Sequence, residues 1–391
     1  MAAPQKRLPL TVWALGLVSF CTDLASEMIV PLLPAFLAGL GAGPIALGLL
    51  QGSSDAVVAL LRALSGWLSD RQRRKKPWIV AGYAISSLLR PLMALVQSPL
   101  QALLVRAGDR LGKGLRSAPR DALIADVVAS GQRGAAFGLQ RAMDHAGALA
   151  GTLLGFLLLS TGSGHREIFA WAALPGALAV AALVVLVRER PPAADVAAAD
   201  PTGRAGDLRA LWPFLGVVFC SAFGSVIDLF LLQRALELGI PLAHAPLLWA
   251  VLHLVRSTLA APLGRLSDRL GRRRVIAGGL AAQFAVLLVF GMVRESWSWA
   301  VWPLFAAHGL HAAFSEGAER GFVADLTRAG RRGTVFGIYH ACSGLSAFVA
   351  AVAIGVLWDR VGAMAALHTA AAAAIVGAGL LLTIVAAPRR D

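Results

Sequence analysis

The chain has 391 residues, of which 57% are hydrophobic and 15% are charged. Its mean hydropathy is +0.69, and a soluble domain of this size has too little interior to enclose so many apolar side chains, so the surplus must face lipid. The formal net charge of +14 would suit a nucleic-acid-binding protein, but the basic residues gather in gaps on one side of the predicted membrane spans. The composition therefore indicates an all-α membrane protein with no nucleic-acid partner.

A helix needs about 20 consecutive apolar residues to cross a bilayer. The chain supplies about a dozen such runs, separated by short polar gaps. The first run follows a basic start and has no clear small-residue cleavage site, which predicts an uncleaved helix. In chain order we expect transmembrane helices at 10–38, 45–69, 77–97, 101–126, 134–160, 167–187, 210–235, 245–268, 274–293, 298–325, 334–358 and 363–387.

The longest polar gap divides these spans into two sets of six. Residues 188–209 are rich in Pro and Ala, and they predict a cytoplasmic linker between an N-terminal bundle at 1–187 and a C-terminal bundle at 210–391. The basic gaps at 70–76 and 268–274 fall on the same side as the linker and both chain ends. We therefore expect both termini in the cytoplasm, a bacterial inner-membrane location and a monomer.

A sequence repeat relates the two halves. Gly66-Trp67-Leu68-Ser69-Asp70-Arg71 returns 198 positions later as Gly264-Arg265-Leu266-Ser267-Asp268-Arg269, and Asp126 returns 199 positions later as Asp325. Repeated halves with a substrate site between them are typical of carriers that alternate access by rocking one half against the other.

These motifs resemble the major facilitator superfamily over essentially the whole chain. GWLSDRQRRKKP and GRLSDRLGRRR are similar to the GxLxDRxGRR signature of that superfamily. The resemblance implies two pseudo-symmetric six-helix bundles and a contact at these loops that stabilises the outward-facing state; the alternative is that the arginines only set topology. The loop residues concerned are Gly66, Asp70, Arg71, Gly264, Asp268 and Arg269.

A second pair of loops carries an acidic residue followed seven positions later by arginine. Asp126 with Arg133, and Asp325 with Arg332, resemble acidic and basic pairs of sugar porters. Each pair could bridge two helix ends in one conformation and part in the other, or simply close its own loop. We also expect Arg120 and Asp121 to act at a gate or at the cytoplasmic end of their helix.

The predicted fourth helix carries the most charge. Its cations and its acid recur at three- and four-residue spacing, so most share one helix face, and charges at this depth are costly unless they meet a partner or water. The stretch DRLGKGLRSAPRDALIAD resembles a bacterial facilitator subgroup, and Arg106 matches the arginine that the superfamily associates with proton coupling. The excess of cations suggests an anionic or partly anionic substrate, unless nearby acids cancel it. The residues are Arg106, Asp109, Arg110, Lys113 and Arg116.

Other ionisable residues are expected in a central cavity, where buried carboxylates suit proton transfer and nearby cations are their structural partners. In the first half these are Asp23, Glu27, Asp55, Arg90, Arg141 and Asp144. In the second half they are Asp228, His308, His311, Glu316 and His340. His308, His311 and Glu316 also permit a metal-binding interpretation, but one helix supplies too few ligands.

The sequence contains no nucleotide-binding loop, nucleophile elbow or CxxC motif, so we expect neither an enzyme nor a cofactor. The leading hypothesis is a secondary transporter, coupled to protons, that moves a small solute and exports it. The alternatives are efflux of a metal or metal complex, and a non-transporting membrane receptor or assembly factor built on the same scaffold.

Overall fold

The computed structural model describes residues 7–41, 44–72, 74–189, 208–225, 227–241, 244–327 and 330–385. The regular secondary structure of this part of the chain is entirely helical. The predicted linker at 188–209 lies almost entirely outside the described residues.

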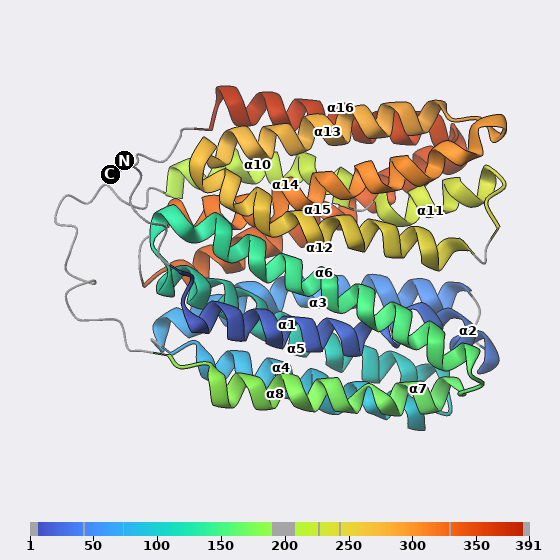
Figure 1. The fold of residues 1–391 in the computed structure, drawn as a ribbon, viewed down its shortest axis with the longest axis horizontal. Helices are drawn as coiled ribbons and strands as arrows, with labels where there is room; N and C mark the ends of the chain where they lie inside the picture. The colour runs from blue at the N-terminus through green and yellow to red at the C-terminus, as the bar shows by residue number, and fades with distance from the viewer. Residues whose placement is uncertain are drawn as a thin grey trace.

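The first half of the chain forms one bundle of helices, drawn in blue and green in Figure 1. Ser98 is the N-cap of the most charged helix of this bundle, because its side chain accepts a hydrogen bond from the backbone N–H of Gln101 at 3.3 Å. Pro99 suits the first position of the helix, since it has no backbone N–H that would need an acceptor. The elements are α1 (Leu10–Glu27), η1 (Val30–Leu32), α2 (Leu33–Gly39), α3 (Pro44–Arg71), α4 (Lys76–Leu92), η2 (Met93–Leu95), α5 (Pro99–Val127), η3 (Ser130–Gln132), α6 (Arg133–Ser160), α7 (His165–Trp171) and α8 (Ala173–Leu186).

The second half forms a matching bundle beside the first, drawn in yellow to red (Figure 1). Its elements are α10 (Leu208–Ser225), α11 (Ile227–Glu237), α12 (Ala245–Leu270), α13 (Arg272–Met292), η5 (Glu295–Ala300), α14 (Val301–Asp325), α15 (Arg332–Arg360) and α16 (Ala363–Thr383). When α1 with α2, α7 with α8, and α10 with α11 each count as one crossing, the described residues form the twelve crossings that the sequence predicts.

The expected first and seventh spans differ from the structure in a common way. The predicted span 10–38 is divided into α1, η1 and α2, because Pro31 and Pro34 interrupt the run. The predicted span 210–235 is divided into α10 and α11. Within the described residues, nine helical segments are long and apolar enough to cross a membrane. Two of the remaining long helices, α5 and α14, instead carry charges that are buried inside the protein.

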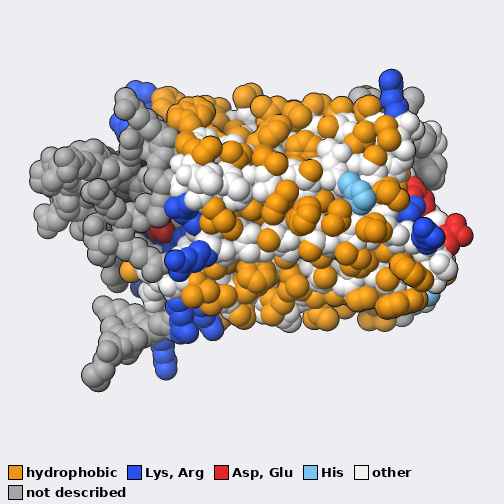
Figure 2. Space-filling view, turned by 90° about the horizontal axis from the view of Figure 1, so that it is seen from above, with side chains coloured by type: hydrophobic (Ala, Val, Ile, Leu, Met, Phe, Trp, Pro, Cys, Tyr) orange, Lys and Arg blue, Asp and Glu red, His pale blue; other side chains and the backbone are white. Residues whose placement is uncertain are grey.

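The outer surface is apolar between two polar ends. Figure 2 shows hydrophobic side chains over the length of the bundle and Lys and Arg side chains gathered mainly at one end. Exposed leucines such as Leu60, Leu88 and Leu95 are more than 70% accessible, a burial pattern that suits lipid rather than water.

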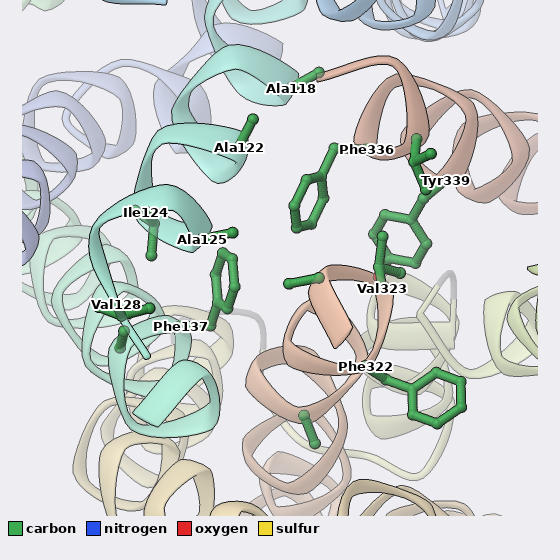
Figure 3. Packing of buried hydrophobic residues seen from close by; sticks show 14 of the residues in the cluster. Ala118, Ala122, Ile124, Ala125, Val128, Phe137, Phe322, Val323, Phe336 and Tyr339 are labelled. Carbon is green, nitrogen blue, oxygen red and sulfur yellow. The ribbon is translucent and has the colours of Figure 1, made fainter. Parts of the chain in front are cut away.

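The two bundles meet along two helix pairs. α6 packs against α12, and α3 packs against α15. Between these pairs an apolar cluster joins the halves: the Phe137 and Phe336 rings, both fully buried, lie 5.7 Å apart between centroids (Figure 3). The two phenylalanines occupy equivalent positions of the repeat, so each half contributes the same residue to this part of the core.

Candidate functional site

The loop aspartates that recur in the two halves cap helices of the opposite half. Asp70, at the end of α3, accepts hydrogen bonds from the backbone N–H groups of Gly333 at 3.0 Å and Thr334 at 2.7 Å, where α15 begins. The hydroxyl of Thr334 also donates to Asp70, at 2.9 Å. A carboxylate at a helix N-terminus satisfies unpaired N–H groups and the positive end of the helix dipole. Each such cap therefore joins the two halves.

Asp268 repeats this arrangement in the other direction. From the end of α12 it accepts from the backbone N–H groups of Gly134 at 2.9 Å and Ala135 at 2.8 Å, where α6 begins. Arg272 also donates to Asp268 at 2.6 Å. We call the end of the bundle that contains both caps the closed end.

Glycines allow the helices to come close enough for these caps. A Cβ atom on Gly66 would lie 2.1 Å from the carbonyl oxygen of Gly333, and one on Gly264 would lie 2.2 Å from that of Gly134. Any larger residue at Gly66 or Gly264 would force the helices apart. The sequence expectation of close helix approach here agrees with this packing.

The acidic and basic pairs of the closed end exchange partners between halves. Arg133 donates to Asp325 at 2.7 Å and to the carbonyl of Ala324 at 2.9 Å, while Arg332 donates to Asp126 at 2.6 Å. Neither arginine bonds the aspartate of its own loop. The alternative of an ion pair that closes one loop is therefore wrong for this conformation.

Two other loop arginines contribute differently. Arg71 lies over the ring of Trp67, with 5.4 Å between the guanidinium carbon and the ring centroid. Arg269 lies in the last turn of α12. Gly271, which follows that helix, has a φ of 98° that favours glycine.

A fully buried carboxylate joins the halves nearer the middle of the bundle. Asp121 on α5 pairs with its neighbour Arg120 at 3.0 Å, with Arg320 on α14 at 3.3 Å and with His340 on α15 at 2.9 Å. Asp121 has no exposed surface. A buried acid with partners from both halves holds them together as long as those partners stay in place.

A second ionic cluster lies on α6 and crosses to α14 and α12. Arg141 pairs with Asp144 at 2.6 Å and with Glu316 at 3.2 Å. His145 lies 3.3 Å from both Glu316 and His253. Two of the predicted cavity residues, Arg141 and Glu316, thus meet directly across the interface.

The interior of the first half pairs most of its cations. Arg90 and Arg106 share Asp109, at 2.9 and 3.4 Å, and Arg90 also donates to the carbonyl of Thr22 on α1. Arg116 instead has uncharged partners. It donates to Ser86 at 2.7 Å, and its guanidinium lies 4.4 Å from the ring centroid of Tyr83, an arrangement suited to a cation–π contact.

Four predicted cavity residues have no such partner. Asp23 and Glu27 on α1, and Arg110 and Lys113 on α5, make no hydrogen bond or ion pair among the described side chains, and all four are half-buried. The side chain of Asp55, which the sequence places in the same cavity, lies outside the described set.

In the second half the predicted residues point in different directions. Asp228 forms two hydrogen bonds with Arg256, both at 2.9 Å, and accepts from His308 at 2.8 Å. His311 lies 3.2 Å from the carbonyl oxygen of Gly279 and makes no hydrogen bond to that cluster among the described residues. The described residues contain no group of three metal-binding side chains, so this geometry does not support the metal-binding interpretation.

Comparison with known proteins fits this architecture. A family model described as Major Facilitator Superfamily matches residues 15–259 and 214–391. The chain belongs to the major facilitator superfamily. The resemblance stated from the loop motifs is thereby confirmed at the level of the superfamily, and the chain is a transporter rather than an enzyme.

Relatives include transporters of this superfamily. An uncharacterised MFS-type transporter of Methanocaldococcus jannaschii is 31% identical over 392 residues, covering 97% of this chain and 96% of that protein. The multidrug resistance protein MdtG of Dickeya zeae is 29% identical over 305 residues, or 72% of each chain.

Solved structures of the superfamily share the fold. The human organic anion transporter MFSD10 has a TM-score of 0.80 at 16% identity, covering 96% of this chain and 100% of that one. The proton:xylose symporter XylE, bound to 6-bromo-6-deoxy-D-glucose, has a TM-score of 0.76 at 16% identity, covering 97% and 95%. These likenesses confirm the all-α fold of two six-helix bundles.

Arg320, His145 and His253 were not among the predicted site residues, and Asp121 was expected only as a gate or cytoplasmic-end residue. Asp121, Arg320, His145 and His253 all make contacts between the halves. One signal in the sequence marks two of them: Asp121 and Arg320 are 199 positions apart, the offset of the repeat. A charged residue at the same position of both repeats is a candidate for the interface.

Proposed function

We propose that this major facilitator is a monomeric, proton-coupled carrier of small solutes in a bacterial inner membrane. The observation that carries the proposal is the reciprocal pair of caps made by Asp70 and Asp268. Each aspartate binds the N-terminus of a helix in the other half. Both caps therefore form together when that end closes and break together when it opens. This is a two-state contact of the kind that alternating access requires.

The charge on the closed end supports its assignment to the cytoplasm. Basic side chains such as Lys75, Lys76 and Arg273 lie at this end, and such residues favour the cytoplasmic side. The helix α1 begins and α16 ends there as well (Figure 1), which supports cytoplasmic termini. On this assignment, the structure corresponds to the outward-facing state.

Proton coupling is supported by the carboxylates of α1. Asp23 and Glu27 lie at membrane depth without an ion-pair partner, and ionisable groups in such positions are typical of proton pathways. Neutralisation by Arg106 or Arg110 was the structural alternative, but neither arginine forms an ion pair with these acids in this conformation.

Export is favoured over uptake by two observations. The relative from Dickeya zeae is described as a multidrug resistance protein. Gly147 and Gly151 on α6 lie against the backbone of α1, since a Cβ added to them would lie 2.2 Å from the carbonyl oxygen of Phe20 and 2.4 Å from that of Leu24. This glycine spacing partly resembles the antiporter motif of the superfamily, from which the chain departs at Thr152, where that motif has proline.

The test uses purified full-length protein in liposomes loaded with an unfractionated metabolite extract. We expect an imposed pH gradient to change the contents measured by mass spectrometry, and Asp23→Asn with Glu27→Gln to abolish the effect of the gradient. Flux that ignores the gradient would contradict proton coupling. Absence of any flux, with folded protein, would favour a receptor or assembly factor.

A further inference from the structure

The four ionisable side chains without partners form one group. In the described interior of the first half, Arg90, Arg106 and Arg116 each have a hydrogen-bond partner. Asp23, Glu27, Arg110 and Lys113 have none. Holding charges inside a membrane protein without partners costs several kcal/mol per charge, so this group is expected to meet something that the protein itself does not supply.

The group is divided by sign between two helices. Both acids lie on α1, four positions apart, and both bases lie on α5, three positions apart, so each pair lies on one helix face. Glu27 interacts electrostatically with Arg110 and Lys113, and Asp23 with Lys113. No nitrogen and oxygen atoms of this group approach within 4.0 Å. The acids and the bases are therefore close enough to interact but too far apart for an ion pair, and we call this separation the gap.

A small pocket is lined by the chain neighbours of Glu27 and Arg110, and it holds a donor without an acceptor. Ser26, Arg90, Arg106 and Asp109 line this pocket together with apolar side chains. Arg106 is only 4% exposed, and its Nε and Nη2 atoms are buried without a hydrogen-bond partner. Buried guanidinium N–H groups without acceptors are rare in proteins, which marks this position for an acceptor group of a ligand.

We infer that the substrate of this carrier is a dipolar solute, such as an amino-acid-like zwitterion, that carries a cationic group and an anionic group together. Its cationic group lies against Asp23 and Glu27. Its anionic group lies against Arg110 and Lys113, with Arg106 as a further donor. This inference rests on the proposed transport function and names the substrate class of the same site.

A solute of one sign fits the group less well. An anion would use the bases but would face the carboxylates of α1, and a cation would face the bases of α5 in the same way. A neutral solute would leave all four charges without partners. Only a ligand with both signs satisfies both helices, and ligand groups that complete a buried polar site also reject analogues that lack them.

The field in the gap can be measured without knowing the substrate. Cys21, Cys220 and Cys342 are replaced by alanine, and Ser26→Cys is introduced as the reporter beside Glu27. Its labelling rates are then measured with 2-sulfonatoethyl and 2-trimethylammonioethyl methanethiosulfonate, an anionic and a cationic reagent of similar size. The ratio of the anionic to the cationic rate reports the local potential.

We expect the two pairs of charges to move this ratio in opposite directions. Asp23→Asn with Glu27→Gln should raise it by about tenfold, and Arg110→Gln with Lys113→Gln should lower it by about tenfold, since each pair acts at short range in a low dielectric. Arg234→Gln, in the other half, is the matched control and should change nothing. Labelling in dodecyl sulfate gives the total reactive thiol.

Each outcome decides the inference. If only the bases affect the ratio, the site is built for an anion; if only the acids do, it is built for a cation; either result overturns the inference. Reporter thiols that react in dodecyl sulfate but not in the native protein would show a gap closed to solutes, which also overturns it. Solutes moved in the flux assay should carry both charges, and a failure of all flux would contradict transport while the labelling result still decides the site.

Discussion

Replacing Gly66 with alanine should open the closed end. The new Cβ would lie 2.1 Å from the carbonyl oxygen of Gly333, and such contacts essentially never occur under 3.0 Å. Because the obstacle is backbone on both sides, no side chain can move to relieve it. α3 and α15 must therefore separate by about 0.9 Å at this point.

The separation acts directly on the cap made by Asp70. Its three hydrogen bonds measure 2.7 to 3.0 Å, and the added distance stretches them to about 3.6–3.9 Å, beyond hydrogen-bonding range. Each bond to a charged group contributes about 1.5–3 kcal/mol. With water replacing part of the loss, we expect the open form to gain about 2–4 kcal/mol, or about 30- to 1000-fold in the conformational equilibrium.

The assay is the distance between spin labels at Gln72 and Arg331, which are both exposed at the closed end. Gly66→Ala should shift the distance distribution of the purified protein to longer values. Gly216→Ala is the control, because a Cβ at this exposed position would meet nothing within 4 Å. Equal distributions in the two variants would refute the argument that close helix packing controls closure.

The remaining predictions concern single charges and one ring. Asp268→Asn should weaken the second cap and shift the same spin-label equilibrium, and a double change with Gly66→Ala should shift it further; an unchanged distribution in Asp268→Asn would contradict this role. Asp121→Asn should lower the free energy of unfolding by about 3–5 kcal/mol, because it leaves buried cations uncompensated. Arg320→Gln should lower it less, since Asp121 keeps Arg120 as a partner. Thermal unfolding in detergent measures both variants, and a larger loss in Arg320→Gln would contradict the central role of Asp121. Phe336→Ala should cost about 3–5 kcal/mol by leaving a cavity between the halves, and a melting temperature equal to that of the unsubstituted protein would show that the cluster contributes little.

The sequence predicts the fold well because the signals involved are local or repeated. Hydrophobic runs mark the crossings, and the repeat of Asp70 at Asp268 assigns them to two equivalent halves. The sequence also identifies Arg133 and Arg332 as important. It does not identify their partners, because a pair within one loop and a pair between loops have the same sequence pattern.

The interior of the site shows the same limit. Arg106, Arg110 and Lys113 look alike on one helix face. Asp109 pairs with Arg106 three positions away, but only the fold brings Arg90 on α4 to the same aspartate and leaves Arg110 and Lys113 without partners. Asp121 is expected at a gate, but its partners in the other half cannot be read from the sequence because its neighbour Arg120 already offers a plausible partner. Its contacts with α14 and α15 depend on helices about 200 residues away, beyond the reach of any local pattern.

The ion pair between Asp121 and Arg320 determines which half can pair with which. A residue that touches its own counterpart in the repeat lies on the axis that relates the halves. In an assembly of two identical halves, this position would set aspartate against aspartate or arginine against arginine, and like charges in a buried contact repel. The opposite signs therefore favour a contact between the two unlike halves over a contact between two copies of either half. If the halves were produced as separate polypeptides, each should recognise the other in preference to a second copy of itself.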